Sequence, residues 1–327
     1  MNMNEFKTPK LSKFINVQDD KTIIPESPLM TKLGFGTGVS VYRLKRSPKI
    51  GLYQSPWAIK KVLRNSPQKG IDLKCYAERL KDEADILKKL NHPNIVGFRA
   101  FVKAEDGRDC LAMEECDSSV GDLIEERVNE ELGPFSVEKI LKVALDVAKA
   151  LDYLHRECHL LHGDIKSFNV LVKGDFEVIK LCDFGVSVPL NEDGVLDKAA
   201  GSHYVGTSCW LAPEALKNDG IIPVTNKADI FSFGLVLWEM MTLKIPNFDH
   251  SLDEDLSMLE LSTTDADDEW LMHSETDLKY GTRPSLPEAE LGDEYKPIIE
   301  LFNLCTEEDI NKRPSAEEIV EQLKALV

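Results

Sequence analysis

Apolar residues fill almost every position from residue 228 to residue 241. A helix that is apolar on all sides belongs in the interior of a domain, so this stretch predicts a buried helix. A second pattern begins after Ser136, which can cap a helix, and repeats at the 3.6-residue period of one apolar face. Its members are Ile140, Ala144, Val147, Leu151 and Leu154. Near the end of the chain, Ser315 and Glu318 match the capping box that begins a helix. The second half of the chain is therefore predicted to be mainly helical.

The first half of the chain shows the alternation that is typical of strands. Apolar and polar residues alternate after a glycine-rich stretch at 33–38, and short apolar runs follow at 57–62 and 110–116. One helical pattern lies between them, from Leu73 to Leu90. The apolar stripe of that predicted helix consists of Leu80, Ala84, Leu87 and Leu90.

One acidic residue, Glu83, falls inside this apolar stripe. A carboxylate on a surface that faces the core is costly unless it meets a cation. Lys60, in the predicted strand at 57–62, is the obvious candidate. The burial pattern therefore predicts a buried ion pair between Lys60 and Glu83.

Two segments lack any such periodicity. Residues 1–28 are polar and contain Thr8-Pro9 and Ser27-Pro28, which predicts a mobile tail. Residues 249–277 hold eleven Asp or Glu and no Lys or Arg. Because like charges resist compact packing, we expect a mobile acidic loop after the buried helix. This loop could recruit basic substrates or serve solubility alone, and the sequence leaves both open.

Composition narrows the class of protein. The 327 residues suffice for one two-lobed unit or for two domains. The net charge of −18 argues against direct nucleic-acid binding, which depends on neutralising phosphates with Lys and Arg. No apolar run reaches the length of a membrane span, and the N-terminus has no secretory apolar segment, so no membrane association is expected. The seven cysteines are scattered, odd in number and without a Cys-x-x-Cys pair, which predicts free thiols in the cytoplasm or nucleus.

The candidate chemistry lies between residues 160 and 185. This stretch reads Leu-Leu-His-Gly-Asp164-Ile-Lys166-Ser-Phe-Asn169, then two apolar runs around Gly-Asp, and then Cys-Asp183-Phe-Gly. Transfer of a phosphoryl group needs a carboxylate near the attacking hydroxyl, a cation near the phosphate oxygens and oxygen ligands for magnesium. This stretch resembles the catalytic loop and metal-binding turn of protein kinases, which implies that Asp164 would accept or orient the hydroxyl proton and that Lys166 would meet the γ-phosphate. Asn169 and Asp183 would hold the metal. Either half alone also fits a β-hairpin with polar turns, whereas both halves at this spacing favour phosphoryl transfer.

These motifs, with Ala-Pro-Glu at 212–214, resemble those of eukaryotic protein kinases over residues 29–327. The resemblance implies an α+β, bilobal protein kinase fold, with a small antiparallel-sheet lobe, a larger mainly helical lobe and ATP with Mg²⁺ between them. It divides the chain into a mobile tail at 1–28, an N-lobe at 29–114 and a C-lobe at 115–327 with an acidic insert at about 249–277.

The resemblance also assigns an ATP site. The glycine-rich stretch is followed by a strand pattern, as in kinases, although its third glycine, Gly38, falls one place early. Lys60 would pair with the α- and β-phosphates, Met113 would guard the back of the adenine pocket, and the backbone of Glu114 and Cys116 would hydrogen-bond adenine. The implied cofactor-binding residues are Leu33, Gly34, Gly36, Gly38, Val41, Ala58, Lys60, Met113, Glu114 and Cys116; the implied catalytic residues are Asp164, Lys166, Lys60 and Glu83; the implied metal ligands are Asn169 and Asp183.

Three further contacts follow from the resemblance. Thr207 would set the hydroxyl of a substrate beside the catalytic loop. Asp229, inside the apolar helix, must find hydrogen-bond donors, and in kinases this residue holds the backbone of the catalytic loop. Arg313 would pair with Glu214.

Narrower motifs resemble the MAP-kinase-kinase-like kinases of dividing cells. Asp-Ile-Lys at 164–166 is similar to the serine/threonine class, and the motifs at 183–187 and 204–207 are similar to those of MAP kinase kinases. The resemblance implies transfer of the ATP γ-phosphate to Ser or Thr hydroxyls of protein substrates, including MAP kinases, and leaves dual specificity open. The alternative is a pseudokinase scaffold that binds partners without catalysis, which is disfavoured because the catalytic and metal-binding residue types are all present.

The catalytic loop also predicts how the protein is regulated. Many kinases carry Arg at the position of Gly163, where it pairs with a phosphate on the activation segment. That segment here has a histidine where MAP kinase kinases carry a phosphorylated serine. We therefore predict that control lies in the tail, at Thr8 and Ser27, through an upstream proline-directed kinase, rather than at Ser202 or Thr207.

The two ends of the chain carry short interaction motifs. Lys10, Lys13, Ile15 and Val17 follow the basic-then-apolar pattern of a MAP kinase docking segment, although a solvated tail also explains them. The C-terminal Lys-Ala-Leu-Val327 lacks the Ser or Thr that common PDZ ligands carry two residues before the terminal Val. This difference argues against binding to a PDZ domain.

Overall fold

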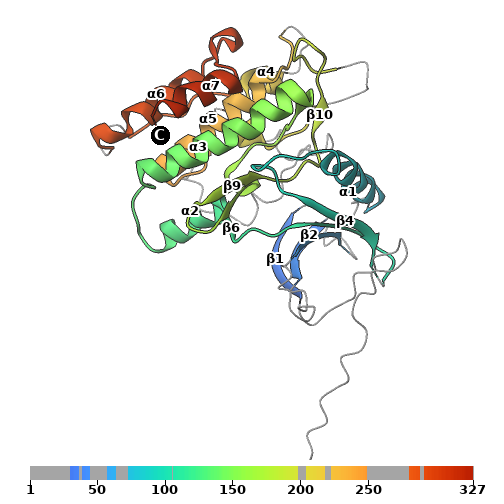
Figure 1. The fold of residues 1–327 in the computed structure, drawn as a ribbon. Helices are drawn as coiled ribbons and strands as arrows, with labels where there is room; N and C mark the ends of the chain where they lie inside the picture. Colours follow the sequence, from blue (N-terminus) through green and yellow to red (C-terminus); the bar gives the residue numbers. More distant parts are fainter. Residues whose placement is uncertain are drawn as a thin grey trace, which may run out of the picture.

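Two lobes of different composition make up the structure, a computed structural model in which a strand-rich part lies beside a helix-rich part (Figure 1). The structure describes residues 30–36, 39–44, 57–63, 73–104, 106–197, 204–217, 222–248, 280–287 and 291–326. The predicted tail with Thr8 and Ser27, the whole predicted acidic insert at 249–277, and Ser202 lie outside these residues, so the predictions about them stay predictions.

A five-stranded antiparallel sheet forms the first lobe, in the order β1-β2-β3-β5-β4. The strands are β1 (Met30–Gly36), β2 (Val39–Leu44), β3 (Trp57–Val62), β4 (Phe98–Lys103) and β5 (Asp109–Glu114). The predicted glycine-rich connection does join two antiparallel strands, because β1 pairs with β2. In the same sheet Lys60 of β3 lies opposite Val41 of β2, which places the lysine beside the glycine-rich hairpin.

Helix α1 (Leu73–Leu87) packs against this sheet with the predicted stripe, since Leu80, Ala84 and Leu87 are buried. The helix ends three residues before the predicted end at Leu90. The backbone bonds explain the difference: Lys88 still donates to the residue four before it, whereas Lys89 and Leu90 donate to residues three before them. This tighter turn ends the α-helix ahead of Pro93.

The second lobe is built around α5 (Lys227–Thr242), in which residues 228–241 are all buried. This confirms the prediction from the continuous apolar run. The other helices are α2 (Val120–Asn129), α3 (Val137–Asp152), α4 (Pro213–Lys217), α6 (Lys296–Cys305) and α7 (Ala316–Lys324). The short strands of this lobe form two small sheets. They are β6 (Ser118–Ser119), β7 (Leu160–Leu161), β8 (Val170–Lys173), β9 (Val178–Leu181) and β10 (Val188–Pro189).

Two capping predictions have different outcomes. Ser315 and Glu318 form the capping box at the start of α7, as predicted. Ser136 does precede the first residue of α3, but its side chain makes no capping hydrogen bond, so that part of the prediction is wrong. The apolar face of α3 is enough to fix the helix, because nine of its residues from Ile140 to Leu151 are buried.

The seven cysteines are all free thiols, as their spacing predicts. Among the residues that the structure describes, no helix is both long enough and apolar enough to cross a membrane.

Candidate active site

A buried aspartate on α5 holds the loop that carries the candidate catalytic residues. Asp229 Oδ1 accepts from the backbone N–H of Gly163 at 3.0 Å, and Oδ2 accepts from the backbone N–H of His162 at 2.9 Å. Oδ2 also lies 2.8 Å from His155 Nε2. Burial opposes the charge of Asp229, but these donors outweigh it and lower the pKa of the carboxyl. The prediction that Asp229 finds donors in the catalytic loop is confirmed.

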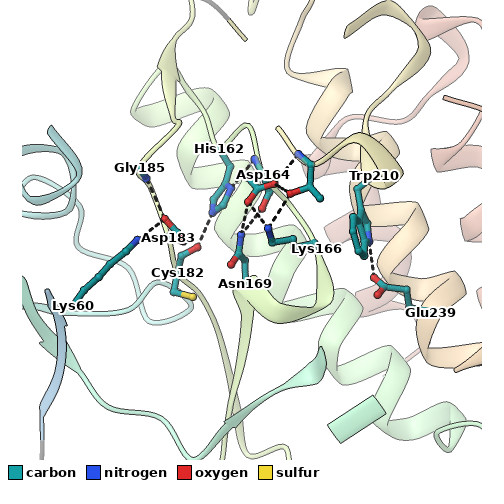
Figure 2. A network of polar contacts seen from close by, with 11 residues as sticks. Lys60, His162, Asp164, Lys166, Asn169, Cys182, Asp183, Gly185, Trp210 and Glu239 are labelled. Atoms are coloured by element: carbon teal, nitrogen blue, oxygen red, sulfur yellow. Dashed lines mark hydrogen bonds and ion pairs between the residues drawn. The ribbon is translucent and has the colours of Figure 1, made fainter. Parts of the chain in front are cut away.

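Three side chains predicted to act on the substrate contact one another, and two of them, Asp164 and Lys166, are labelled in Figure 2. Thr207 Oγ1 donates to Asp164 Oδ1 at 2.7 Å, and Lys166 Nζ donates to Thr207 Oγ1 at 2.8 Å. Lys166 Nζ also lies 3.0 Å from Asp164 Oδ2. The activation segment therefore contacts both groups of the catalytic loop, as the sequence predicts for Thr207.

The predicted ion pair between the sheet and α1 is present. Lys60 Nζ lies 2.9 Å from Glu83 Oε2 and 2.8 Å from Asp183 Oδ1. Burial opposes the charge of Lys60, but the two carboxylates outweigh it and raise the pKa of the ammonium group. Burial raises the pKa of Glu83 to about 7, against the effect of Lys60. One lysine thus ties β3, α1 and the Asp183-Phe-Gly turn together.

The same residues fit a magnesium–nucleotide complex by the chemistry of their donors. Asn169 uses its Nδ2 for both bonds to Asp164, which leaves its amide oxygen as the atom that would bind a metal. Asp183 engages Lys60 through Oδ1 only, and 41% of its side chain is exposed. The Lys60 ammonium outweighs the effect of burial and lowers the pKa of Asp183 to about 2, so the group is ionised at neutral pH. Mg²⁺ prefers such hard oxygen ligands, so Asn169 and Asp183 suit the metal role.

Asp183→Asn is expected to weaken magnesium-dependent nucleotide binding, because an amide brings no negative charge to the metal and leaves Glu83 as the carboxylate that pairs with Lys60. We expect a loss of at least the ~10-fold that even an outer-shell partner of a metal typically costs. Titration of Mg²⁺ at a fixed concentration of a fluorescent ATP analogue measures it. Asp193→Asn, which changes an exposed loop residue, serves as the control. An Asp183→Asn protein with the metal titration of the wild type would contradict the assignment.

The predicted adenine end is formed by β2, β3 and β5. Ala58 and Met113 are buried and lie opposite each other in the β3–β5 register. The backbone N–H of Glu114 donates to the carbonyl of Gly97 at 2.8 Å, so it is not free for adenine. The prediction for Glu114 is therefore narrowed to its carbonyl oxygen. Cys116, the other residue whose backbone is predicted to bind adenine, is also buried.

The glycine-rich hairpin is only partly described. Leu33, Gly34 and Gly36 lie in β1, and Val41 lies half-buried in β2. Gly38 lies outside the described residues. The roles of these residues in phosphate binding stay predictions.

Gly163 has a structural reason to be glycine. Its φ is +85°, and a Cβ at this position would lie 2.9 Å from the carbonyl oxygen of Val186. Any other residue type would combine a left-handed backbone with a clash against the backbone just after the Asp183-Phe-Gly turn. The absence of an arginine here thus has a local cause in this fold.

Gly163→Ala is expected to lower the free energy of unfolding by about 1–2 kcal/mol from the left-handed backbone, and further from the clash. Urea denaturation measures this loss. Two matched controls separate the causes: Gly107 has a φ of +83° with nothing within 4 Å of its added Cβ, and Gly133 has open space without a positive φ. The order of loss should be Gly163→Ala, then Gly107→Ala, then Gly133→Ala. Equal stability of the Gly163→Ala and Gly107→Ala proteins would remove the clash from the explanation.

The contacts of two carboxylate side chains near the site, Glu114 and Glu239, were not predicted from the sequence. The side chain of Glu114 reaches from β5 to the second lobe, with Lys173 Nζ at 2.9 Å and Lys180 Nζ at 3.2 Å. Glu239 is buried in α5 and accepts hydrogen bonds from Ser167 and Trp210. Burial raises its pKa to about 7. A signal for Glu239 was present, because it is an acid within the same apolar run that led to Asp229.

Comparison with known proteins agrees with this geometry. Residues 28–323 match the protein kinase domain family. The chain is 50% identical over 98% of its length to the human lymphokine-activated killer T-cell-originated protein kinase, and covers 98% of that protein. It is 28% identical over 77% of its length to the serine/threonine-protein kinase STY17 of Arabidopsis thaliana, where it covers 38% of the relative. It is 38% identical over 50% of its length to the rat mitogen-activated protein kinase kinase kinase 12, where it covers 17% of the relative.

Proposed function

The chain belongs to the protein kinase family and is a serine/threonine protein kinase, and we propose that it is a MAP-kinase-kinase-like enzyme of dividing cells. It transfers the γ-phosphate of ATP to Ser or Thr hydroxyls of protein substrates. Family membership implies ATP and Mg²⁺ as cofactors. The activation-segment motifs at 183–187 and 204–207 support the subfamily assignment.

The single observation that best supports a catalytic function is that two contacts occur together. Lys60 pairs with Glu83 across β3 and α1, and Thr207 contacts both Asp164 and Lys166. A pseudokinase scaffold would need the fold but not this arrangement. We therefore assign Asp164 to accept or orient the hydroxyl proton and Lys166 to meet the transferring phosphate.

Magnesium–ATP supplies the phosphoryl group and the metal charge that offsets the phosphates. The chain's own residues do the rest. Lys60 and the glycine-rich hairpin hold the nucleotide, and Asn169 and Asp183 hold the metal. Thr207 limits where the acceptor hydroxyl can sit relative to Asp164.

Two classes of protein substrate are candidates, MAP kinases and MAP kinase kinases, which stand at successive tiers of the MAP kinase cascade. The sequence motifs favour MAP kinases as substrates. Some relatives are named mitogen-activated protein kinase kinase kinases, which supports the next tier up, with MAP kinase kinases as substrates. We favour MAP kinases, because the resemblance to MAP kinase kinases lies in the activation segment itself.

The remaining assignments are proposals as well. We place the lobe boundary at Glu114, with an N-lobe at 29–114 and a C-lobe at 115–327. The enzyme works in the cytoplasm, the nucleus or both. Phosphorylation of Thr8 by a proline-directed kinase regulates it, and it uses neither a membrane nor nucleic acid.

A phosphorylation assay tests the proposed function. Purified full-length protein is incubated with Mg-ATP and a panel of catalytically inactive MAP kinases, inactive MAP kinase kinases and basic peptides. Phosphate on Ser or Thr of a MAP kinase, lost in the Asp164→Asn protein, supports the proposal. Phosphate on MAP kinase kinases alone moves the enzyme up one tier. ATP binding with no phosphorylated substrate favours the scaffold.

A further inference from the structure

Glu239 contacts two separate segments that carry the proposed catalytic groups. Its Oε1 accepts from Ser167 Oγ at 2.6 Å. Its Oε2 accepts from Trp210 Nε1 at 2.7 Å (Figure 2). Ser167 directly follows Lys166 in the catalytic loop, and Trp210 lies three residues after Thr207 in the activation segment. A single carboxylate therefore links both segments to α5.

All three partners are removed from water. Glu239 is 2% exposed, Ser167 is 1% exposed and Trp210 is 5% exposed. Ser167 and Trp210 each belong to a short 3₁₀ turn, Ser167–Asn169 and Ser208–Trp210. Each turn is thus fixed to α5 by a hydrogen bond that no solvent competes for.

The contacts that depend on this linkage are short. Thr207 meets Asp164 at 2.7 Å and Lys166 at 2.8 Å, although 43 and 41 residues separate these partners along the chain. A displacement of 1 Å at a reacting group can cost about a hundredfold in rate. Two segments so far apart in sequence keep such distances only if a third element fixes both.

We propose that Glu239 is a positioning residue for phosphoryl transfer to a protein hydroxyl, acting by fixing the catalytic loop and the activation segment in register on α5. It acts through Ser167 and Trp210 and touches neither nucleotide nor acceptor. The inference rests on the proposed serine/threonine phosphorylation and deepens it.

The chemistry of the donors determines which substitutions are informative. Trp210→Phe keeps a large ring and removes only the indole N–H, so it releases the activation segment. Ser167→Ala removes the hydroxyl and releases the catalytic loop. Glu239→Gln is the conservative variant: its amide oxygen can accept from the indole while its amide nitrogen donates to the Ser167 hydroxyl, which can act as acceptor.

The test compares two reactions of the same full-length protein. One is phosphorylation of a protein substrate, and the other is slow ATP hydrolysis, in which water is the acceptor. For Trp210→Phe and Ser167→Ala we expect kcat for the protein substrate to fall by about 10- to 100-fold, while the KM for ATP and the rate of ATP hydrolysis change by about twofold or less. Glu239→Gln should retain more protein phosphorylation than either.

Coupling provides a second readout. If both links serve one function, the Ser167→Ala/Trp210→Phe double variant should be little worse than the poorer single variant. Asp146→Asn is the matched control, because Asp146 is also a buried helical carboxylate, on α3, that accepts a backbone N–H from Ile179. It should lower the melting temperature without changing the ratio of protein phosphorylation to ATP hydrolysis.

An unchanged ratio in both single variants, or an equal fall of both reactions in proportion to the folded fraction, overturns the positioning role. If Glu239→Gln does not fold, the two single-donor variants decide the question alone. A wild-type protein that hydrolyses ATP but phosphorylates no protein overturns the proposed function, and this inference with it. This outcome differs from that of an active wild-type protein whose variants keep the wild-type ratio of the two reactions, which overturns the positioning role alone.

Discussion

Asp164→Asn should abolish most phosphoryl transfer, by about a hundred- to ten-thousand-fold, while the protein still binds Mg-ATP. Both oxygens of Asp164 are engaged: Oδ1 accepts from Thr207, and Oδ2 lies 3.0 Å from Lys166 Nζ. An asparagine has one acceptor oxygen and no basicity, so it can neither take the hydroxyl proton nor orient both neighbours. Nucleotide binding should persist, because Lys60 and Asp183 are unchanged.

The measurement is kcat for a phosphorylated protein substrate, together with the dissociation constant of a fluorescent ATP analogue. Asp175→Asn is the matched control, since Asp175 is a mainly exposed acid of the same lobe that pairs only at the surface with Lys139. It should retain wild-type turnover. An Asp164→Asn protein that binds nucleotide and turns over within tenfold of the wild type would exclude Asp164 from the role of base.

The contacts that the sequence predicts best are those of a charged residue that lies among apolar residues. Glu83 falls on an apolar stripe and Asp229 lies in an apolar helix, so each had to find a partner, and each does. The physical reason is that a buried charge without a partner costs several kcal/mol, which leaves few alternatives open. The order of strands and helices was predictable for a similar reason, because periodicity reports directly on which face is buried.

Contacts set by the meeting of distant segments could not be predicted in the same way. Glu239 meets a serine 72 positions and a tryptophan 29 positions away in the sequence. No spacing rule identifies these partners, although an acid within an apolar helix does indicate that hydrogen-bond partners are present. The sequence predicts that the backbone of Glu114 binds adenine, but it does not show that the N–H of Glu114 donates to the carbonyl of Gly97, a contact that depends on how β4 and β5 pack. The end of α1 was not predicted either. The spacing of apolar residues continues to Leu90, whereas the backbone hydrogen bonds change to a tighter turn after Lys88.

The pair formed by Arg313 and Glu214 should carry the largest effect on stability. Arg313 Nη1 and Nη2 donate to the two carboxylate oxygens of Glu214 at 2.7 and 3.0 Å. The side chains are 0% and 1% exposed. The pair connects the end of the activation segment to the segment before α7, and it confirms the predicted partner of Arg313.

Arg313→Met is expected to lower the free energy of unfolding by about 3–5 kcal/mol, because it leaves the Glu214 carboxylate buried without a cation. Urea denaturation at neutral pH measures the loss. Arg283→Met is the matched control: Arg283 pairs with Glu307 at 3.1 Å, but both side chains are 35% exposed. A half-exposed pair contributes about 0–1 kcal/mol, so the control should lose little from its charges.

The double variant Arg313→Met/Glu214→Leu separates the two physical explanations. If the cost of Arg313→Met comes from an uncompensated buried charge, removing that charge as well should restore much of the stability, since apolar replacements of buried pairs are often neutral. If the cost comes instead from the hydrogen bonds of Arg313 to the backbone of Glu307 and Lys227, the double variant should stay as unstable as the single one. A fully stable Arg313→Met protein would contradict both explanations and show that the activation segment is held elsewhere.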